Sequence, residues 1–308
     1  MASFLSSHGL LLIAVLIYSL QFTLAAKLDK SVFPYHAGPL LSGNIPVNLV
    51  WYGKFTPEQR RIMSDFIASL SNPTPEQPSV ASWLRLTDKF YHAATFPVSL
   101  NLSLGAEVLD ENYSLGKSLT SAQLYELAKK GGEDLVLNVL LTAADVTVEE
   151  FCRGRCGTHA LGTGPVSGKK NSNSKFNYIW VGNSETQCAG LCAWPFHEAA
   201  NGPKTPPLKA PNGDIGLDGM VINVASLMAG TVTNPFGNGF YQGPKDAPLE
   251  AATACPGVFG KGASPGFAGT LLTDSNTGAS YNANGINGRK FLLPALMDPE
   301  TANCATLV

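Results

Sequence analysis

The pair His197-Glu198 is the nearest approach in the chain to the H-E-x-x-H motif of metalloproteases. A metalloprotease helix needs H-E-x-x-H, because a second histidine one turn later turns both imidazoles toward the same zinc ion. Here two alanines follow the pair, and then Asn201-Gly202-Pro203, which would break a helix. We therefore predict no metal at this pair and interpret His197 as a surface or structurally bonded histidine.

A second candidate is the segment Gly262-Ala263-Ser264-Pro265-Gly266, which matches the G-x-S-x-G string of hydrolases. In those enzymes the backbone N–H after the serine donates to the oxyanion, and a helix follows. Pro265 has no N–H and a glycine-rich run follows it, so the segment predicts a turn. The glycines at 237, 239 and 243 miss the spacing of dinucleotide-binding loops, and we predict no cofactor.

Three further histidines, at 36, 92 and 159, could join carboxylates in a site, but the sequence does not say which groups would meet. An extracellular hydrolase with His197 and Glu198 in a cleft beside Asp218 stays open as an alternative.

Six cysteines all lie in the second half of the chain, and an even number is typical of a disulfide-bonded secreted protein. Two C-x-x-x-C pairs could instead hold a structural zinc ion, but an oxidising compartment favours disulfides. We predict two local bridges and one long-range bridge: Cys152 with Cys156, Cys188 with Cys192, and Cys255 with Cys304.

Aromatic side chains also gather in the second half and could form a platform on which sugar rings stack. They are Trp180, Trp194, Phe196, Phe236, Phe240 and Tyr241. Core packing is the favoured interpretation, because aromatics near disulfides more often fill a small core. The candidate binding surface consists of Trp180, Trp194, His197 and Glu198.

The first residues predict secretion. An apolar run from Gly9 to about Leu20 precedes small residues at Ala25 and Ala26, which is the layout of a cleavable signal peptide over residues 1–25. The run is shorter than a spanning helix requires, and we expect no membrane span after cleavage. The sequons at Asn101 and Asn112 fit the same compartment.

Composition narrows the classes of partner. The formal net charge is −2 and charged residues make up 14% of the chain, so nucleic-acid binding and electrostatic attachment to membranes receive no support. With 31 glycines and 21 prolines, the fold must be rich in turns, while 44% hydrophobic residues suffice for a substantial core.

Periodicity predicts the elements that must position these residues, and their order indicates an α/β or α+β fold. The second half should be Gly/Pro-rich and disulfide-bonded. Residues 26–308 could form one domain, or two with a boundary near 150. Strands are predicted at 47–52, 96–104, 135–141 and 176–181, and helices at 57–70, 79–90, 121–131 and 218–233.

Several segments resemble the plant Exordium, or phosphate-induced-protein, family. They cover nearly all of the predicted mature chain, and the cysteine-tryptophan block is distinctive. One departure is local, because His-Gln-Pro is common in the family where this chain has His197-Glu198-Ala199. The segments are YHAGPLLSG (35–43), the stretch at 47–70, YIWVGN (178–183), TQCAGLCAWPFH (186–197), and the stretches at 216–244, 254–274 and 281–299.

The resemblance implies a protein of the apoplast or cell wall that takes part in cell expansion, in brassinosteroid-responsive growth and in adjusting growth to carbon status. It implies no catalytic residues. The leading hypothesis is therefore a non-enzymatic growth-regulatory protein whose partner is a cell-wall component or extracellular protein. A carbohydrate-binding wall protein is the other alternative.

Residues 226–235 are also similar in layout to the helix of some secreted microbial zincin-like proteins, in which H-E-x-x-E precedes Thr-Asp-Pro. Ser226, Leu227 and Gly230 occupy the three metal-binding and catalytic positions, and they cannot bind zinc. This likeness implies a zincin-like scaffold without its metal site.

Overall fold

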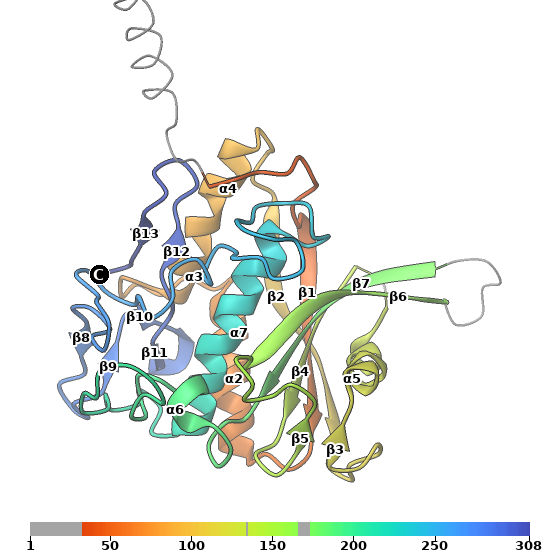
Figure 1. Cartoon of the computed structure of the whole chain (residues 1–308), viewed down its shortest axis with the longest axis horizontal. Coiled ribbons are helices and arrows are strands. Elements are labelled where there is room, and N and C mark those ends of the chain that lie inside the picture. Colours follow the sequence, from red (N-terminus) through yellow and green to blue (C-terminus); the bar gives the residue numbers. More distant parts are fainter. Residues whose placement is uncertain (1–32, 134, 166–172) are drawn as a thin grey trace, which may run out of the picture.

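The computed structural model describes residues 33–133, 135–165 and 173–308. The predicted signal peptide, residues 1–25, lies outside the described residues. The fold is mixed α/β, as predicted, and is organised around one five-stranded sheet (Figure 1).

The sheet has the strand order β2-β1-β4-β7-β6. The first four strands pair in parallel, whereas β6 pairs with β7 in antiparallel fashion. The edge strand β6 is therefore antiparallel to the other four strands. The bounds are β1 (Gly43–Tyr52), β2 (Leu100–Asp110), β4 (Leu137–Thr142), β6 (Gly157–Pro165) and β7 (Asn173–Gly182).

The central strand β4 is buried at all six positions. Apolar residues dominate it because both faces of this parallel strand are covered, and its buried Asn138 and Thr142 are hydrogen-bonded to Gly132 and Trp180. Its pairing with β7 also carries the sheet across residue 150, where a domain boundary was considered.

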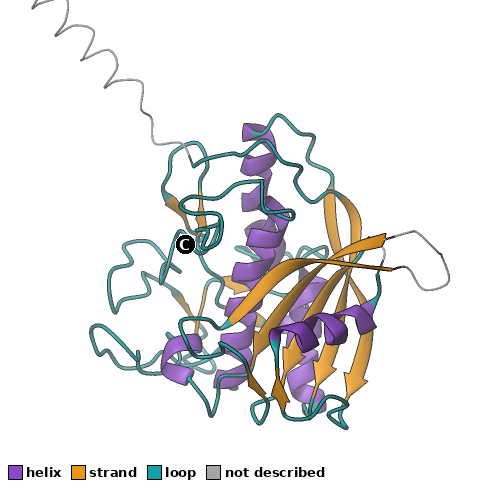
Figure 2. Ribbon diagram, turned by 45° about the vertical axis from the view of Figure 1, so that its right-hand side comes forward, coloured by secondary structure: helices purple, strands orange, loops and turns teal. Residues whose placement is uncertain are grey.

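Helices cover both faces of the sheet (Figure 2). The helices α2 (Pro57–Ser69) and α7 (Ile215–Thr233) lie side by side on one face, and α5 (Ser121–Ala128) lies on the other. Gln59 links α2 to α7, because its side chain donates a hydrogen bond of 2.9 Å to Asp214, the N-cap of α7.

The predicted start of α2 is confirmed in detail. Thr56 accepts a hydrogen bond from the backbone N–H of Gln59, and the Gln59 side chain accepts one from the Thr56 N–H. Pro57 occupies the first turn, where its missing N–H costs nothing. The face that carries Ile62 and Phe66 is buried against the sheet.

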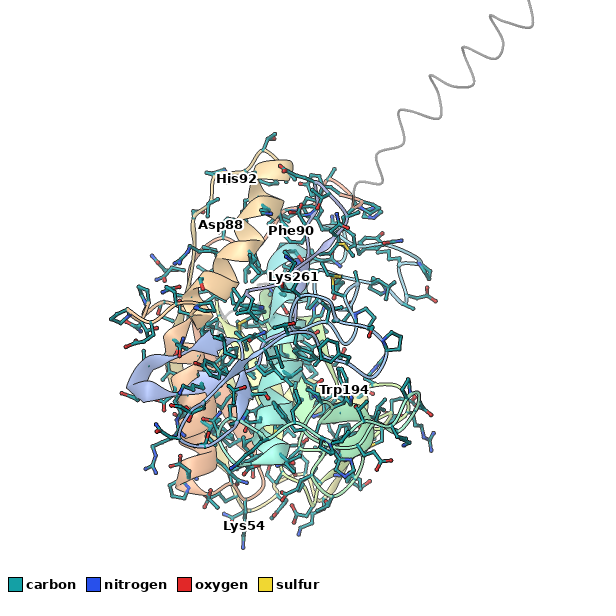
Figure 3. The ribbon with its side chains drawn as sticks, turned by 90° about the vertical axis from the view of Figure 1, so that its left-hand side faces the viewer. Lys54, Asp88, Phe90, His92, Trp194 and Lys261 are labelled. Atoms are coloured by element: carbon teal, nitrogen blue, oxygen red, sulfur yellow. A yellow bond between two sulfur atoms is a disulfide. The ribbon has the colours of Figure 1, made fainter. Side chains whose placement is uncertain are left out.

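The helix predicted over residues 79–90 is confirmed as helical backbone, but it is not one continuous α-helix. The chain instead forms α3 (Val80–Leu84), a 3₁₀ turn at Arg85–Thr87 and α4 (Asp88–Ala93), which carries Asp88, Phe90 and His92 (Figure 3). Thr87 donates its hydroxyl hydrogen bond to the Leu84 carbonyl at 2.7 Å. Such local bonds compete with a continuous helical ladder, which explains the break.

The helix α7 is the longest in the described part of the chain. It is the one described helix that is long and apolar enough to cross a membrane, with a mean hydropathy of 1.5, but 78% of that stretch is buried inside the molecule. It packs against β7 and β6 on one side and contributes Ile222 to a second, smaller core with Phe196 and Phe259.

After α7 the chain consists of loops, turns and two-residue strands, as its glycine and proline content predicts. The predicted turn at Ser264 is also confirmed, since Ser264 and Phe267 exchange backbone hydrogen bonds. The remaining short elements are β3 (Ser118–Leu119), a 3₁₀ turn at Lys129–Gly131, β5 (Thr147–Val148), α6 (Ala189–Cys192), β8 (Leu272–Thr273), β9 (Ser280–Tyr281), β10 (Ala283–Asn284), a 3₁₀ turn at Ile286–Gly288, β11 (Lys290–Phe291), β12 (Leu296–Met297) and β13 (Cys304–Ala305).

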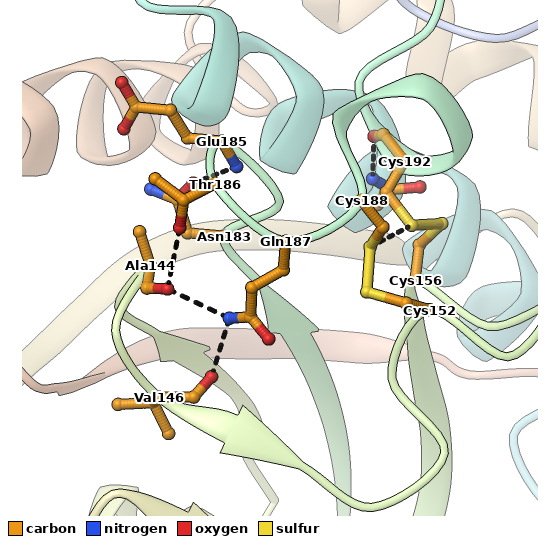
Figure 4. The surroundings of a disulfide bond; sticks show 11 residues. Ala144, Val146, Cys152, Cys156, Asn183, Glu185, Thr186, Gln187, Cys188 and Cys192 are labelled. Atoms are coloured by element: carbon orange, nitrogen blue, oxygen red, sulfur yellow. Dashed lines mark hydrogen bonds between the residues drawn. A yellow bond between two sulfur atoms is a disulfide. The ribbon is translucent and has the colours of Figure 1, made fainter. Parts of the chain in front are cut away.

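All six cysteines form disulfides, but the two local bridges predicted from the C-x-x-x-C spacing are wrong. Cys152 pairs with Cys188 and Cys156 pairs with Cys192, with Cα atoms 5.7 and 5.4 Å apart (Figure 4). Because β6 and β7 are antiparallel, the residues before β6 lie beside those after β7. The third predicted bridge, between residues 255 and 304, is confirmed.

A candidate ligand-binding cleft

A cleft of about 690 Å³ runs between the edge strand β6, the second half of α7 and the loop that follows the helix. β6 supplies His159 and its neighbours, α7 supplies Asn223, Ser226 and Leu227, and the loop supplies residues between 234 and 253. Three segments far apart in the sequence therefore enclose one site.

The floor of the cleft is a hydrogen-bonded trio of His159, Glu250 and Asn234. The His159 Nε2 lies 2.6 Å from one carboxylate oxygen of Glu250, and the Asn234 side-chain nitrogen donates to the other at 2.7 Å. Asn234 in turn accepts a hydrogen bond from the Gly239 backbone N–H. Glu250 and Asn234 are almost completely buried, and these bonds compensate for removing them from water.

Gly230 of α7 makes room for this trio. A Cβ atom at this position would lie 2.5 Å from a Glu250 carboxylate oxygen and 3.2 Å from the His159 Nε2. Glycine lowers helix stability by about 1 kcal/mol relative to alanine, so its presence in a buried helix needs a reason. The reason here is the close approach of the Glu250 carboxylate to the helix backbone.

Charged and aromatic side chains form the rim of the cleft. Arg155, Lys245 and Asp246 are exposed, and the Phe236 ring is 41% exposed. Deeper in, the Tyr241 ring stacks on His36 with 3.8 Å between the ring centroids. A ligand would thus meet cations and an aromatic ring at the entrance and fixed polar groups at the floor.

The candidate surface expected from the sequence does not form one site. Trp180 is buried in β7, packs against Phe151 and donates its indole N–H to the Thr142 hydroxyl at 3.2 Å. It therefore belongs to the core and not to a surface. Core packing, the favoured interpretation of the aromatics, holds for this residue.

Trp194, labelled in Figure 3, is not among the residues that line the cleft. It is partly buried against Phe259 and borders two small hollows of about 230 and 140 Å³. The ring of Phe267, which is 50% exposed, lines the smaller hollow. Of the two tryptophans in the candidate surface, Trp194 is therefore the one that is partly exposed.

His197 and Glu198 are both exposed and lie outside the lining of the cleft. The His197 Nδ1 is 3.0 Å from the Glu198 carbonyl oxygen, and the Glu198 carboxylate pairs with Lys204 at 3.1 Å. The interpretation of His197 as a surface histidine is confirmed.

Asp218 does not join this pair, because its side chain is buried in the first turn of α7. It accepts hydrogen bonds from the backbone and the side chain of Asn212, at 2.9 and 2.7 Å. Burial raises the pKa of Asp218 to about 7, although the Asn212 hydrogen bonds act in the opposite direction. A buried Asp218 and an exposed Glu198 cannot act together as a carboxylate pair on one substrate.

Of the three residues aligned with the zincin-like motif, two line the cleft and the third lies behind its floor. Ser226 and Leu227 line it, and Gly230 supports the His159–Glu250 pair. Among the residues that the structure describes, no group of three or more His, Cys, Asp or Glu side chains could hold a metal ion. The zincin-like scaffold itself stays a prediction.

The trio was missed from the sequence because its members are 91 and 16 residues apart along the chain. Two signals were available in the sequence. His159 is a histidine that could pair with a carboxylate, and Gly230 is a glycine inside a predicted apolar helix. Neither identifies Glu250 as the partner.

Comparison with known proteins places the whole of this architecture in one family. The model of the "Phosphate-induced protein 1 conserved region" matches residues 33–307. The chain belongs to the phosphate-induced protein 1 family. No solved structure matches it.

Three members of the family resemble the chain over nearly their whole length. The chain is 62% identical to Protein PHOSPHATE-INDUCED 1 of Nicotiana tabacum, covering 91% of this chain and 90% of that one. It is 61% identical to Protein EXORDIUM of Arabidopsis thaliana, covering 89% and 88%. It is 57% identical to Protein EXORDIUM-like 1 of the same plant, over the full length of both. The matched region of the family includes the cleft and all three disulfides.

Proposed function

We propose that this chain is a secreted protein of the plant apoplast or cell wall that regulates cell expansion by binding a ligand in the cleft, without catalysing a reaction. The family membership supports a role in growth of the kind that the resemblance implies, including responses to brassinosteroid and carbon status. The signal-peptide layout of residues 1–25 and the three disulfides support secretion.

The observation that carries the binding proposal is the preorganised trio on the floor of the cleft. Both carboxylate oxygens of Glu250 are already hydrogen-bonded, and the residue is 5% exposed. Glu250 therefore acts as an anchor that fixes His159, and not as an acid that faces a substrate. Fixed polar groups in a cavity of this size are typical of a ligand site.

Secretion is tested on protein recovered from the extracellular fluid of plant tissue that expresses the full chain. N-terminal sequencing should find a chain that begins at residue 26 or 27. Retention of the uncleaved chain inside the cell would contradict this half of the proposal.

The role of the cleft is tested by measuring cell length in tissue that expresses variants of the full chain. His159→Ala removes the polar group at the centre of the floor, and we expect it to abolish the increase in cell length that the unaltered chain causes. His197→Ala is the matched control, because His197 is an exposed histidine outside the cleft. Equal amounts of secreted protein and equal melting temperatures are required for the comparison.

If His159→Ala does not accumulate, the rim variant Lys245→Glu takes its place, because Lys245 is exposed and its replacement leaves the core untouched. A folded, secreted cleft variant that lengthens cells as much as the unaltered chain would overturn the proposal.

A further inference from the structure

Besides the face of β6 that α7 covers, the cleft follows the open edge of the strand. Eight consecutive residues, 154–161, line it. Successive side chains of a strand point to opposite faces of the sheet, so a face would contribute only every second residue. An unbroken run of lining residues means that the cavity lies alongside the backbone itself.

This edge is able to pair with another strand. β6 is hydrogen-bonded to β7 on one side and is the last strand of the sheet in the described part of the chain. The Gly182 N–H donates to the Cys156 carbonyl, and paired residues of an antiparallel ladder alternate between bonded and non-bonded. Gly157, His159 and Leu161 therefore direct their N–H and C=O groups toward the cleft.

The opposite edge of the sheet differs from the β6 edge in carrying a predicted glycosylation site. It is formed by β2, which carries the predicted glycosylation site at Asn101, an exposed residue whose side chain bonds to Asn44 at 3.1 Å. A glycan there would cover this edge, as natural sheets protect their edges from unwanted pairing. β6 has no sequon in its described residues and has a cleft beside it.

The charges on the rim indicate what should lie in the cleft. Among the ion pairs of the described residues none includes Arg155 or Lys245, and both side chains are exposed. The two acidic residues that line the cleft are Glu250, which is hydrogen-bonded to His159 and Asn234, and the exposed Asp246. Two such cations complement a ligand that carries carboxylates.

We propose that the cleft binds an extended, acidic peptide segment of another extracellular protein, which pairs with β6 as an additional strand. The peptide backbone bonds to residues 157, 159 and 161, and acidic side chains pair with Arg155 and Lys245. This mode of recognition takes affinity from the backbone and specificity from alternate side chains. The inference rests on the proposed function, since it names the ligand class of the same cleft.

The test uses the full secreted chain and synthetic peptides about six to seven residues long, the usual length of a strand. Peptides are first selected from a displayed random library on the immobilised protein, and we expect the selected sequences to be acidic. Each is then resynthesised with a single N-methyl group at each amide in turn. Methylation at every second amide should weaken binding about tenfold, because one backbone hydrogen bond is lost, and methylation at the others should have little effect.

Variants of the protein provide the second arm of the test. Arg155→Ala and Lys245→Ala should each weaken binding of the acidic peptides several-fold. Arg153→Ala is the matched control, because Arg153 is an exposed arginine two residues away and outside the lining of the cleft. None of these exposed side chains is part of the core.

Several results would overturn the inference and leave the proposed function intact. One is peptide binding that is equally sensitive, or insensitive, to methylation at every amide. Another is binding of oligogalacturonide, an acidic wall saccharide, but of no peptide, with loss in the His159→Ala variant. A dimer in sedimentation analysis that Leu161→Pro dissociates would instead make a second copy of the chain the occupant. The proposed function fails separately, if the cleft variants leave cell expansion unchanged.

Discussion

At the scale of single residues, Gly230 is the position whose type the structure explains most fully. Alanine there places a methyl group 2.5 Å from the Glu250 carboxylate. Overpacking of this kind costs about 1–3 kcal/mol, which exceeds the gain of about 1 kcal/mol in helix propensity.

We therefore predict that Gly230→Ala lowers the free energy of unfolding by up to roughly 2 kcal/mol. Urea unfolding of the single and double variants measures it. The cost of Gly230→Ala should shrink in a Glu250→Ala background, because the opposing carboxylate is gone. An equal cost in both backgrounds would show that the methyl group meets something other than this carboxylate.

The raised pKa of Asp218 predicts that the free energy of unfolding depends on pH. Burial raises its pKa to about 7, so between about pH 4 and pH 7 the folded state binds its proton more tightly than the unfolded state. The contribution of Asp218 to stability is therefore greatest at low pH and falls as the pH rises toward 7, by at most about 1.4 kcal/mol per pH unit.

This dependence is measured by urea unfolding at pH 5 and pH 8 of the unaltered chain and of Asp218→Asn, which cannot ionise. We expect the unaltered chain to lose stability relative to the variant as the pH rises. A constant difference between the two proteins at both pH values would mean that Asp218 titrates at its ordinary pKa.

At the scale of elements, the two parallel disulfides join the same pair of segments. Each bridge closes a loop with a sequence separation of 36, but once one is present the other closes only a short ring. In the chain-entropy description, removing one bridge lowers the free energy of unfolding by about 2–3 kcal/mol. Removing both lowers it by about 1 kcal/mol more than the sum of the two single losses.

The prediction is tested by replacing Cys152 and Cys188 with serine, then Cys156 and Cys192, then all four. The Cys255–Cys304 bridge, which joins different segments, serves as the control: its loss should add independently to that of either pair. Strict additivity within the first two pairs would contradict the shared-loop argument.

The elements also show which parts of the fold could be predicted from the sequence. Continuous apolar runs predicted β4 and most of α7, and the capping box at Thr56 predicted the start of α2, because these signals are local. β6 was not predicted, since its glycines and threonines lack the usual alternation. The disulfide pairing depended on the antiparallel register of β6 and β7, which no local spacing encodes.

At the scale of the whole molecule, the candidate site exists only because of the topology. The sheet order brings β6 to the edge, α7 packs against it, and the chain returns after the helix to place Glu250 beside His159. The resemblance predicted the family, which the family model over residues 33–307 confirms, while the secreted compartment stays a prediction from the first residues and the cysteines. Sequence reasoning did not find the cleft, because the partners of His159 come from two other segments.

The most direct test of the central claim, that this cleft is the ligand site, is hydrogen–deuterium exchange of the purified full chain. The exchange is followed with and without the extracellular fluid of growing tissue, for the unaltered chain and for His159→Ala. We predict that the fluid slows exchange at residues 154–161 and in the loop 234–253 of the unaltered chain, and that His159→Ala loses this protection. Protection confined to the loops around Trp194 and Phe267, or none at either place, would contradict the account.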